Sequence, residues 1–165
     1  MCRANVYHTG RCIRVTMFDR ILAPSDGSDA AEQAMHAAVE LAEIHDAAVK
    51  VLYVIDTSVY LRHARVADTI ISELEEDAEE VTDEAADHAR QTEAEMHTEI
   101  VRGVPHEEIQ DHADQHGMDL IVMGTHGRTG LKRAILGSVT EWIVMTSDIP
   151  VLTVKETGDV AALPE

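Results

Sequence analysis

A glycine-rich stretch over residues 124–141 contains the residue types of this chain that are best suited to bind a phosphate group. Glycines allow the backbone to turn sharply and to approach a ligand closely. Residues 137–140, with the sequence Gly-Ser-Val-Thr, place two hydroxyl groups beside a predicted helix start. The free backbone N–H groups at such a start favour an anion, and phosphate in particular.

The charge distribution also favours an anion site in this stretch. The chain carries 31 Asp and Glu against 13 Lys and Arg, a formal net charge of −18. Even so, no acidic residue occurs between Asp119 and Glu141. An acidic chain that excludes carboxylates from one glycine-rich segment and adds cations there is suited to hold something negative. The cations in this gap are Arg128, Lys132 and Arg133.

The spacing does not fit the two most familiar phosphate motifs. A P-loop needs Gly-Lys-Ser/Thr after four intervening residues, and the Rossmann pattern needs a glycine where His126 stands. The pattern present is G-x2-G-x9-G-S. A structural alternative stays open, because Ser138 and Glu141 have the spacing of a capping box, which would satisfy the helix end without a ligand.

Apolar and turn patterns predict five strands that alternate with four helices, which implies a single α/β domain with an open parallel sheet covered on both faces. Ser28 or Asp29 is expected to cap the first helix, and Asp29 with Glu32 forms a second possible capping box. In such sheets ligands bind beyond the carboxyl ends of the strands. The loops over 24–28 and 124–137 should therefore share one crevice if the first and fourth strands are neighbours. The predicted strands are 18–24, 48–55, 96–101, 119–123 and 150–154, and the helices 29–44, 66–92, 105–117 and 138–146.

Two further patterns have plain structural explanations. The acidic run between Glu73 and Glu99 keeps an apolar helical stripe, which predicts a solvated helix face. His112 and His116 have the i, i+4 spacing of metal ligands, but no cysteine lies near them in the sequence. We favour solvated surface histidines over a metal site.

Composition and the chain ends bound the protein class. At 165 residues, with 45% apolar and 3% aromatic residues, the chain suits one domain with an aliphatic core. The acidic excess argues against nucleic acid as a partner, and it resembles the surface of a protein in a high-salt cytoplasm. No apolar run approaches the ~20 residues that span a bilayer. Residues 1–16 contain both cysteines and no acid, so we interpret them as a disordered or mis-annotated extension, with the domain over 17–155 and a tail over 156–165.

The glycine motif and several flanking segments together resemble the universal stress protein family, in particular its ATP-binding subgroup. The resemblance runs from Met17 to about Val154 and includes the opening Ile21-Leu-Ala-Pro-Ser-Asp-Gly-Ser28 and the segment Asp119-Leu-Ile-Val-Met-Gly124. It implies a Rossmann-like fold of the adenine nucleotide alpha hydrolase type. It also implies that ATP or AMP, with Mg²⁺ as a possible companion, binds in the crevice.

By this resemblance, individual positions acquire expected roles. Asp26 would hydrogen-bond ribose hydroxyls or help to hold Mg²⁺ through water, although an Asx turn at the strand end would explain it equally well. Val54 and Met123 would contact adenine, but both are also ordinary core residue types. The residues expected around the phosphates are Gly124, His126, Gly127, Arg128, Gly137, Ser138, Val139 and Thr140, and those flanking base and ribose are Ala23, Pro24, Ser25 and Asp26.

The function expected from the resemblance is a nucleotide-binding regulatory protein of the stress response. In this family the last strand commonly pairs with its copy across a two-fold axis, so we expect a cytoplasmic homodimer through Val151–Val154, with cover by the tail as the alternative. No residue is assigned a catalytic role. A weak ATPase or nucleotide transferase, and an interaction protein that binds no nucleotide, remain as alternatives.

Overall fold

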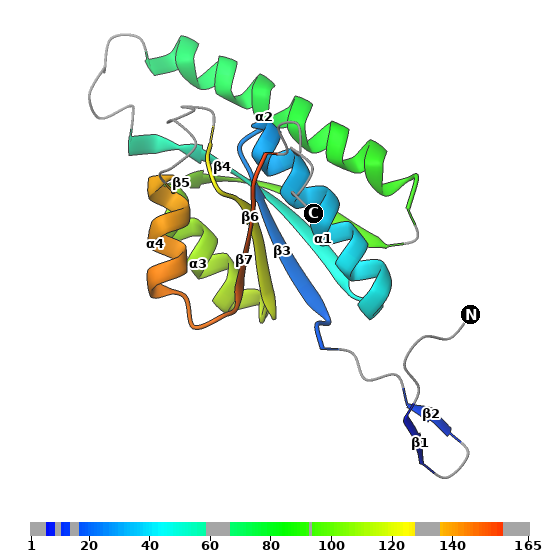
Figure 1. Ribbon diagram of the computed structural model, residues 1–165. Helices are drawn as coiled ribbons and strands as arrows, with labels where there is room; N and C mark the ends of the chain where they lie inside the picture. Colours follow the sequence, from blue (N-terminus) through cyan, green and yellow to red (C-terminus); the bar gives the residue numbers. More distant parts are fainter. Residues whose placement is uncertain are drawn as a thin grey trace, which may run out of the picture.

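Five apolar segments separated by helices form one parallel sheet, as expected for strands that are buried on both faces. The computed structural model describes residues 6–8, 11–13, 17–58, 67–92, 94–127 and 136–156, and its description of side chains begins at residue 17 and leaves out 67–72. The strand order is β5-β4-β3-β6-β7, and every neighbouring pair is parallel (Figure 1). The strands are β3 (Arg20–Ser25), β4 (Ala48–Asp56), β5 (Glu95–Gly103), β6 (Leu120–Gly124) and β7 (Val151–Val154).

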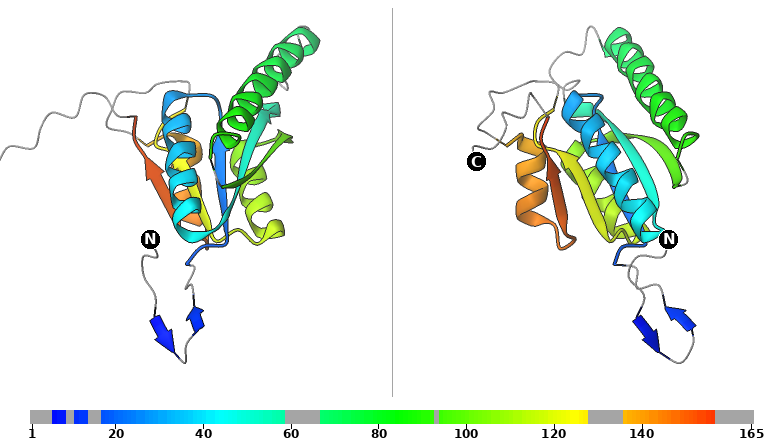
Figure 2. Two further views of the ribbon diagram at one scale, coloured as in Figure 1. Left: turned by 90° about the vertical axis from the view of Figure 1, so that its right-hand side faces the viewer. Right: turned by 45° about the vertical axis from the view of Figure 1, so that its right-hand side comes forward.

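Helices cover both faces of this sheet (Figures 1 and 2). On one face, α1 (Asp29–His45) packs against β3 and β6, and α2 (Ala67–Ala89) packs against β4 and β5. On the other face, α3 (Pro105–His116) and α4 (Ser138–Thr146) contact each other and share a core cluster with the sheet. The predicted fold class is therefore confirmed.

Helix α1 lies close to the sheet because its buried stripe consists largely of alanine. The stripe contains Ala34, Ala38 and Ala42, which are at most 1% exposed. Ser28 is the N-cap, and its side chain accepts a hydrogen bond from the backbone N–H of Ala31. Asp29 is therefore the first helical residue, so the capping box proposed for Asp29 and Glu32 is wrong, whereas the choice of Ser28 as cap is confirmed.

Strand β5 is longer than the six residues predicted from its sequence. It pairs with β4 without interruption from Ala48↔Glu95 to Asp56↔Gly103. Its side chains alternate between exposed and partly buried positions, so its apolar pattern is weak at both ends. The neighbouring strand β4, which is strongly apolar, sets the length of β5 through backbone hydrogen bonds.

The amino-terminal segment contains a small hairpin. Strands β1 (Val6–His8) and β2 (Arg11–Ile13) pair antiparallel and form a sheet separate from the five-stranded one (Figure 1). Part of the segment interpreted above as a disordered extension therefore has regular structure, while its place outside the main domain stays a prediction. Within the described parts of the chain, no helix is long and apolar enough to cross a membrane.

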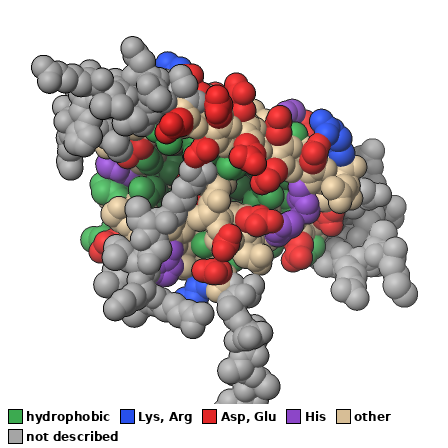
Figure 3. All heavy atoms as spheres, turned by 90° about the horizontal axis from the view of Figure 1, so that it is seen from above, with side chains coloured by type: hydrophobic (Ala, Val, Ile, Leu, Met, Phe, Trp, Pro, Cys, Tyr) green, Lys and Arg blue, Asp and Glu red, His purple; other side chains and the backbone are tan. Residues whose placement is uncertain are grey.

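The acidic residues lie mainly on the solvent side of the helices. In α2, residues such as Glu76, Glu80 and Asp83 are exposed, whereas Ala78 and Ala85 are fully buried against the sheet. This confirms the predicted solvated helix face. Viewed from above, onto the carboxyl ends of the strands, the described surface shows many Asp and Glu side chains and few cations (Figure 3).

His112 is a correction to the sequence-based prediction of two solvated histidines. It is only 7% exposed, and its Nε2 atom is buried without a hydrogen-bond partner in the described part of the chain. Its ring stacks on the exposed His116 ring at a centroid distance of 4.0 Å. Burial lowers the pKa of His112 below its usual value of 6.5, the neighbouring His116 and Lys50 lower it further, and Glu99 opposes them.

We predict that acidification destabilises the protein in part through His112. Because the pKa of His112 is lower in the folded state, the unfolded chain binds the extra proton first, and stability is lost as the pH falls below about 6.5. The free energy of unfolding, measured by urea denaturation between pH 7.5 and pH 5, should fall less steeply in His112→Gln than in the wild type. The exposed His97, changed to Gln in the same way, is the control. Equal slopes in all three proteins would contradict the prediction.

Candidate functional site

The pairing between strands β3 and β6 stops before their carboxyl ends. Their ladder ends at Leu22↔Ile121, whereas β3 remains paired with β4 up to Ser25 and β6 with β7 up to Gly124. The predicted first and fourth strands are thus neighbours, and the chain leaves them toward opposite faces of the sheet. Ligands of open α/β sheets bind at this kind of switch point.

Helix α4 begins at this crevice, and no side chain in the described parts of the chain caps its first turn. Gly137 is the N-cap, and no side-chain hydrogen bond is made there. The backbone N–H of Glu141 bonds to Gly137 O, so the N–H groups of Ser138, Val139 and Thr140 precede the first helical bond. Ser138 is the first helical residue rather than the cap, so the capping box that was the structural alternative for Ser138 and Glu141 is wrong.

The two hydroxyl groups of this turn are not equivalent. Thr140 is 4% exposed, and its Oγ1 donates to Gly124 O at 2.9 Å, which ties α4 to the end of β6. Ser138 is exposed. The group that Thr140 can offer a ligand is therefore its backbone N–H, whereas Ser138 can offer both a backbone N–H and a hydroxyl.

The three glycines of the motif have different steric environments. A Cβ on Gly124 would lie 2.8 Å from the backbone carbon of Ala30, so close packing on α1 requires glycine there. A Cβ on Gly127 would collide with Asp26 Oδ2. A Cβ on Gly137 would lie 3.4 Å from Thr125 O, which is ordinary contact. Packing within the protein thus accounts for Gly124 and contributes to Gly127, while Gly137 has room for a side chain.

The loop after β3 is rigidly organised around Asp26. Asp26 Oδ1 accepts hydrogen bonds from Ser28 N at 3.1 Å and from Ser28 Oγ at 2.6 Å. This is the Asx turn that was one of the two interpretations of Asp26. Ser28 Oγ also lies 3.4 Å from His126 O, and Gly127 packs on the same carboxylate. The two loops predicted to share a crevice are therefore in direct contact.

Thr125 is a residue of this site that the sequence analysis missed. It is 5% exposed, its N–H bonds to Val154 O, and its O accepts from Gly137 N, both at 2.8 Å. Its Oγ1 lies 2.9 Å from His126 Nδ1. Only its position between two motif residues could have singled it out, because a lone threonine carries no motif of its own.

The residues expected beside the base and ribose lie at the ends of the central strands. Ala23, Pro24 and Met123 are buried, and Val54 is partly buried against the core. Ser25 Oγ accepts a hydrogen bond from Gly27 N at 3.3 Å. These positions can face a ligand mainly through backbone and apolar contact. The predicted cationic residues Arg128, Lys132 and Arg133 lie outside the described residues.

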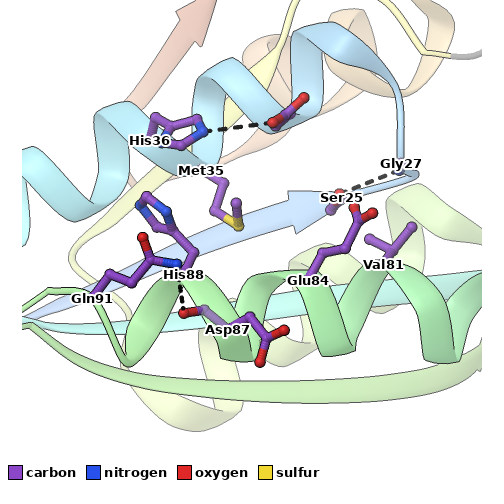
Figure 4. A pocket seen from close by; sticks show the side chains of 10 residues that line it. Ser25, Gly27, Met35, His36, Val81, Glu84, Asp87, His88 and Gln91 are labelled. Atoms are coloured by element: carbon purple, nitrogen blue, oxygen red, sulfur yellow. Dashed lines mark hydrogen bonds and ion pairs between the residues drawn. The ribbon is translucent and has the colours of Figure 1, made fainter.

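A separate cavity of about 390 Å³ lies between α1 and α2 (Figure 4). His36 and His88 meet there edge to face, with ring centroids 4.3 Å apart, and His36 Nε2 is 3.7 Å from Glu32. Burial, and then His36, lower the pKa of His88, against the effect of nearby carboxylates. In the described part of the chain, no three His, Cys, Asp or Glu side chains form a metal-binding group. Ser25 and Gly27 line this cavity as well as the loop after β3.

Comparison with known proteins defines the class to which this fold and crevice belong. Residues 17–155 match the model of the universal stress protein family. The chain therefore belongs to the universal stress protein family, as its motifs indicated.

Individual relatives extend over most of the chain. Universal stress protein MJ0531 of Methanocaldococcus jannaschii is 39% identical over 142 residues, which cover 85% of this chain and 84% of that protein. The solved structure of the protein MJ0577 has a TM-score of 0.76 at 33% identity and covers 87% of this chain and 100% of its own. The structure of the universal stress protein UspA from Lactobacillus plantarum has a TM-score of 0.73 at 36% identity, covering 82% and 97%.

The steric difference between the glycines yields a paired prediction. Gly124→Ala should lower the free energy of unfolding by about 1–3 kcal/mol, because its Cβ must displace the backbone of α1. Gly137→Ala should cost less than about 1 kcal/mol, since its Cβ meets ordinary contacts and only the N-cap preference is lost. Urea denaturation of both variants measures the difference. Equal losses would contradict the close packing of β6 on α1.

Proposed function

We propose that the crevice between β3 and β6 binds an adenine nucleotide, with ATP as the expected ligand, and that occupancy regulates a homodimer in a stress response. The observation that carries the proposal is the start of α4, where the N–H groups of residues 138–140 precede the first helical bond and no side chain of the described residues caps them. A phosphate group satisfies such N–H groups and interacts favourably with the helix dipole.

The charge of the chain adds to this argument. A net charge of −18 disfavours a polyanionic ligand almost everywhere on the protein. The segment from 120 to 140 is free of acid and holds three cations, so within residues 17–155 it is the part where an anion meets least repulsion.

Solved structures of two universal stress proteins hold adenine nucleotides, one in complex with cAMP and one in complex with dAMP. They are 24% and 23% identical to this chain, with TM-scores of 0.68 and 0.60, so their likeness speaks for the fold. The proposal for this chain therefore depends on its own site.

Within the proposal, the phosphates lie on the backbone of the glycine stretch and on the hydroxyl of Ser138. The base and ribose extend over the ends of β3 and β4, next to Pro24 and Val54. Asp26 is held by Ser28, so its carboxylate has a defined position from which to contact ribose or a Mg²⁺-bound water. Binding is the function this arrangement supports, and any hydrolysis would be slow.

We predict that Ser138→Asp weakens nucleotide binding at least tenfold without destabilising the fold. A carboxylate at the first helical position would itself interact with the free N–H groups, which contributes about 0.3–1 kcal/mol to helix stability and repels phosphate. Calorimetric titration of ATP with Mg²⁺ in molar KCl, on protein freed of nucleotide, should show one site per wild-type chain and an affinity at least tenfold lower in the variant. The high salt suits the acidic surface.

The control for this titration is Gln115→Glu, which adds the same charge at an exposed position of α3. It should bind ATP as the wild type does. Unchanged affinity in Ser138→Asp would contradict the site, and no binding by the wild type would leave an interaction protein without nucleotide as the better account.

The proposed dimer uses the edge of the sheet formed by β7. Leu152 on this strand is 40% exposed, and Val144 and Met145 on the neighbouring helix α4 are 46% and 78% exposed. An unpaired edge strand beside exposed apolar side chains is a surface that soluble proteins usually cover. Pairing of Val151–Val154 with a second copy would cover it.

Leu152→Asp is predicted to convert the dimer into a monomer, because it would place carboxylates of two acidic chains on either side of the two-fold axis. Light scattering after size-exclusion chromatography should report a mass change from twice 18.1 kDa to 18.1 kDa. Ile100→Asp on β5, at the opposite edge and 37% exposed, is the matched control and should stay dimeric. If Ile100→Asp dissociated the dimer and Leu152→Asp did not, the interface would lie at the β5 edge, which would contradict the proposal.

A further inference from the structure

Thr125 and His126 form a side-chain pair immediately before the start of α4. Thr125 Oγ1 lies 2.9 Å from His126 Nδ1, and the Thr125 side chain is buried. The backbone of Thr125 is held on both sides, by its N–H to Val154 O and by its O from Gly137 N. The position of the hydroxyl is therefore set by the ends of β7 and α4, and it can hold the imidazole in one orientation.

The second ring nitrogen of His126, Nε2, is buried and has no hydrogen-bond partner among the residues that the structure describes. A buried polar atom without a partner is costly, so a native structure usually supplies one, either from the protein or from a ligand. The Cα atom of His126 lies 3.6 Å from the position that a Cβ on Gly137 would take, so the residue adjoins the N-cap of α4. The backbone of His126 is thus adjacent to the turn that carries the N–H groups of residues 138–140.

We propose that Thr125 is a positioning residue, whose hydroxyl donates to His126 Nδ1 and thereby keeps the proton of the neutral imidazole on Nε2, where it serves as a donor to a nucleotide phosphate. In a neutral imidazole one nitrogen carries the proton and the other accepts. A donor at Nδ1 therefore leaves the Nε2–H tautomer. The opposite tautomer would present a lone pair, which repels phosphate oxygens. This inference rests on the proposed nucleotide site.

The hydroxyl of Thr125 matters because it fixes the imidazole. Without it, the ring is free to turn and to exchange tautomers, so a donor at Nε2 is no longer secured.

The test combines nitrogen NMR with calorimetry on the full chain. In long-range ¹H–¹⁵N spectra of protein free of nucleotide, His126 should show the Nε2–H tautomer, assigned by comparison with His126→Gln. Addition of ATP with Mg²⁺ should shift the Nε2 resonance more than Nδ1. Thr125→Val, which keeps the shape of the side chain, should weaken ATP binding about three- to tenfold at pH 8, as expected for one lost hydrogen bond. Thr125→Ser should restore it.

A double-mutant cycle separates positioning from a general structural effect. If Thr125 acts through His126, Thr125→Val should have no further effect on affinity in the His126→Gln background. Equal weakening in both backgrounds would assign Thr125 a merely structural role and overturn the inference. So would the Nδ1–H tautomer in the wild type.

Failure of the inference and failure of the proposed function give different results. Wild-type protein that binds ATP while His126 Nε2 stays unshifted keeps the proposed function and overturns the inference. Wild-type protein that shows no heat with ATP overturns both. Far-ultraviolet circular dichroism and urea midpoints of each variant verify that it is folded before its affinity is interpreted.

Discussion

The early end of the pairing between β3 and β6 is the constraint on which the site depends. Each strand stays paired with its other neighbour for three residues more, so both strands remain part of the sheet while their ends are no longer paired with each other. Pro24 lies in this part of β3 and has no N–H to extend a ladder. The loops after the two strands then meet beyond these ends through Asp26, Ser28 and the backbone of His126 and Gly127. A crevice with walls held in this way needs little reorganisation to receive a ligand.

Close packing supplies the second requirement of this arrangement. Because only 3% of the residues are aromatic, few large ring side chains are available to fill the space between the helices and the sheet. The alanine stripe of α1 and the missing side chain of Gly124 let the first turn of the helix contact the end of β6 backbone to backbone. A glycine in a family motif can therefore reflect the approach of a helix as much as the approach of a phosphate. In this chain Gly137, with space around it, is the better guide to the proposed ligand.

The acidic faces of the helices and the start of α4 differ in charge. The carboxylates lie mostly in solvent along α1, α2 and α3, where salt screens their mutual repulsion. The start of α4 offers N–H groups, and the first acid of the helix, Glu141, comes only after them. The histidines also fall into two groups, according to their surroundings. His112 and His88 are held in surroundings that lower the pKa of each, so both resist protonation, while exposed histidines such as His97 lie beside carboxylates.

Several properties of this protein were determined by the sequence alone, because they depend on neighbours along the chain. Apolar runs and turn residues located the strands of the five-stranded sheet and its helices within a few residues, and the G-x2-G-x9-G-S pattern with its flanking segments indicated the family. What depends on contacts between distant segments required the tertiary structure. Helix α4 starts at Ser138, as predicted, but its cap is Gly137, whose N–H is bonded to Thr125 O, and the Thr140 hydroxyl turns inward to Gly124. His112 is buried because α3 lies on the sheet, which its surroundings in the sequence do not reveal. The position of Thr125 is also set by distant segments. It follows β6, its N–H bonds to Val154 at the end of β7, and its O accepts from Gly137 at the start of α4. The sequence around Thr125 indicates neither of these two bonds.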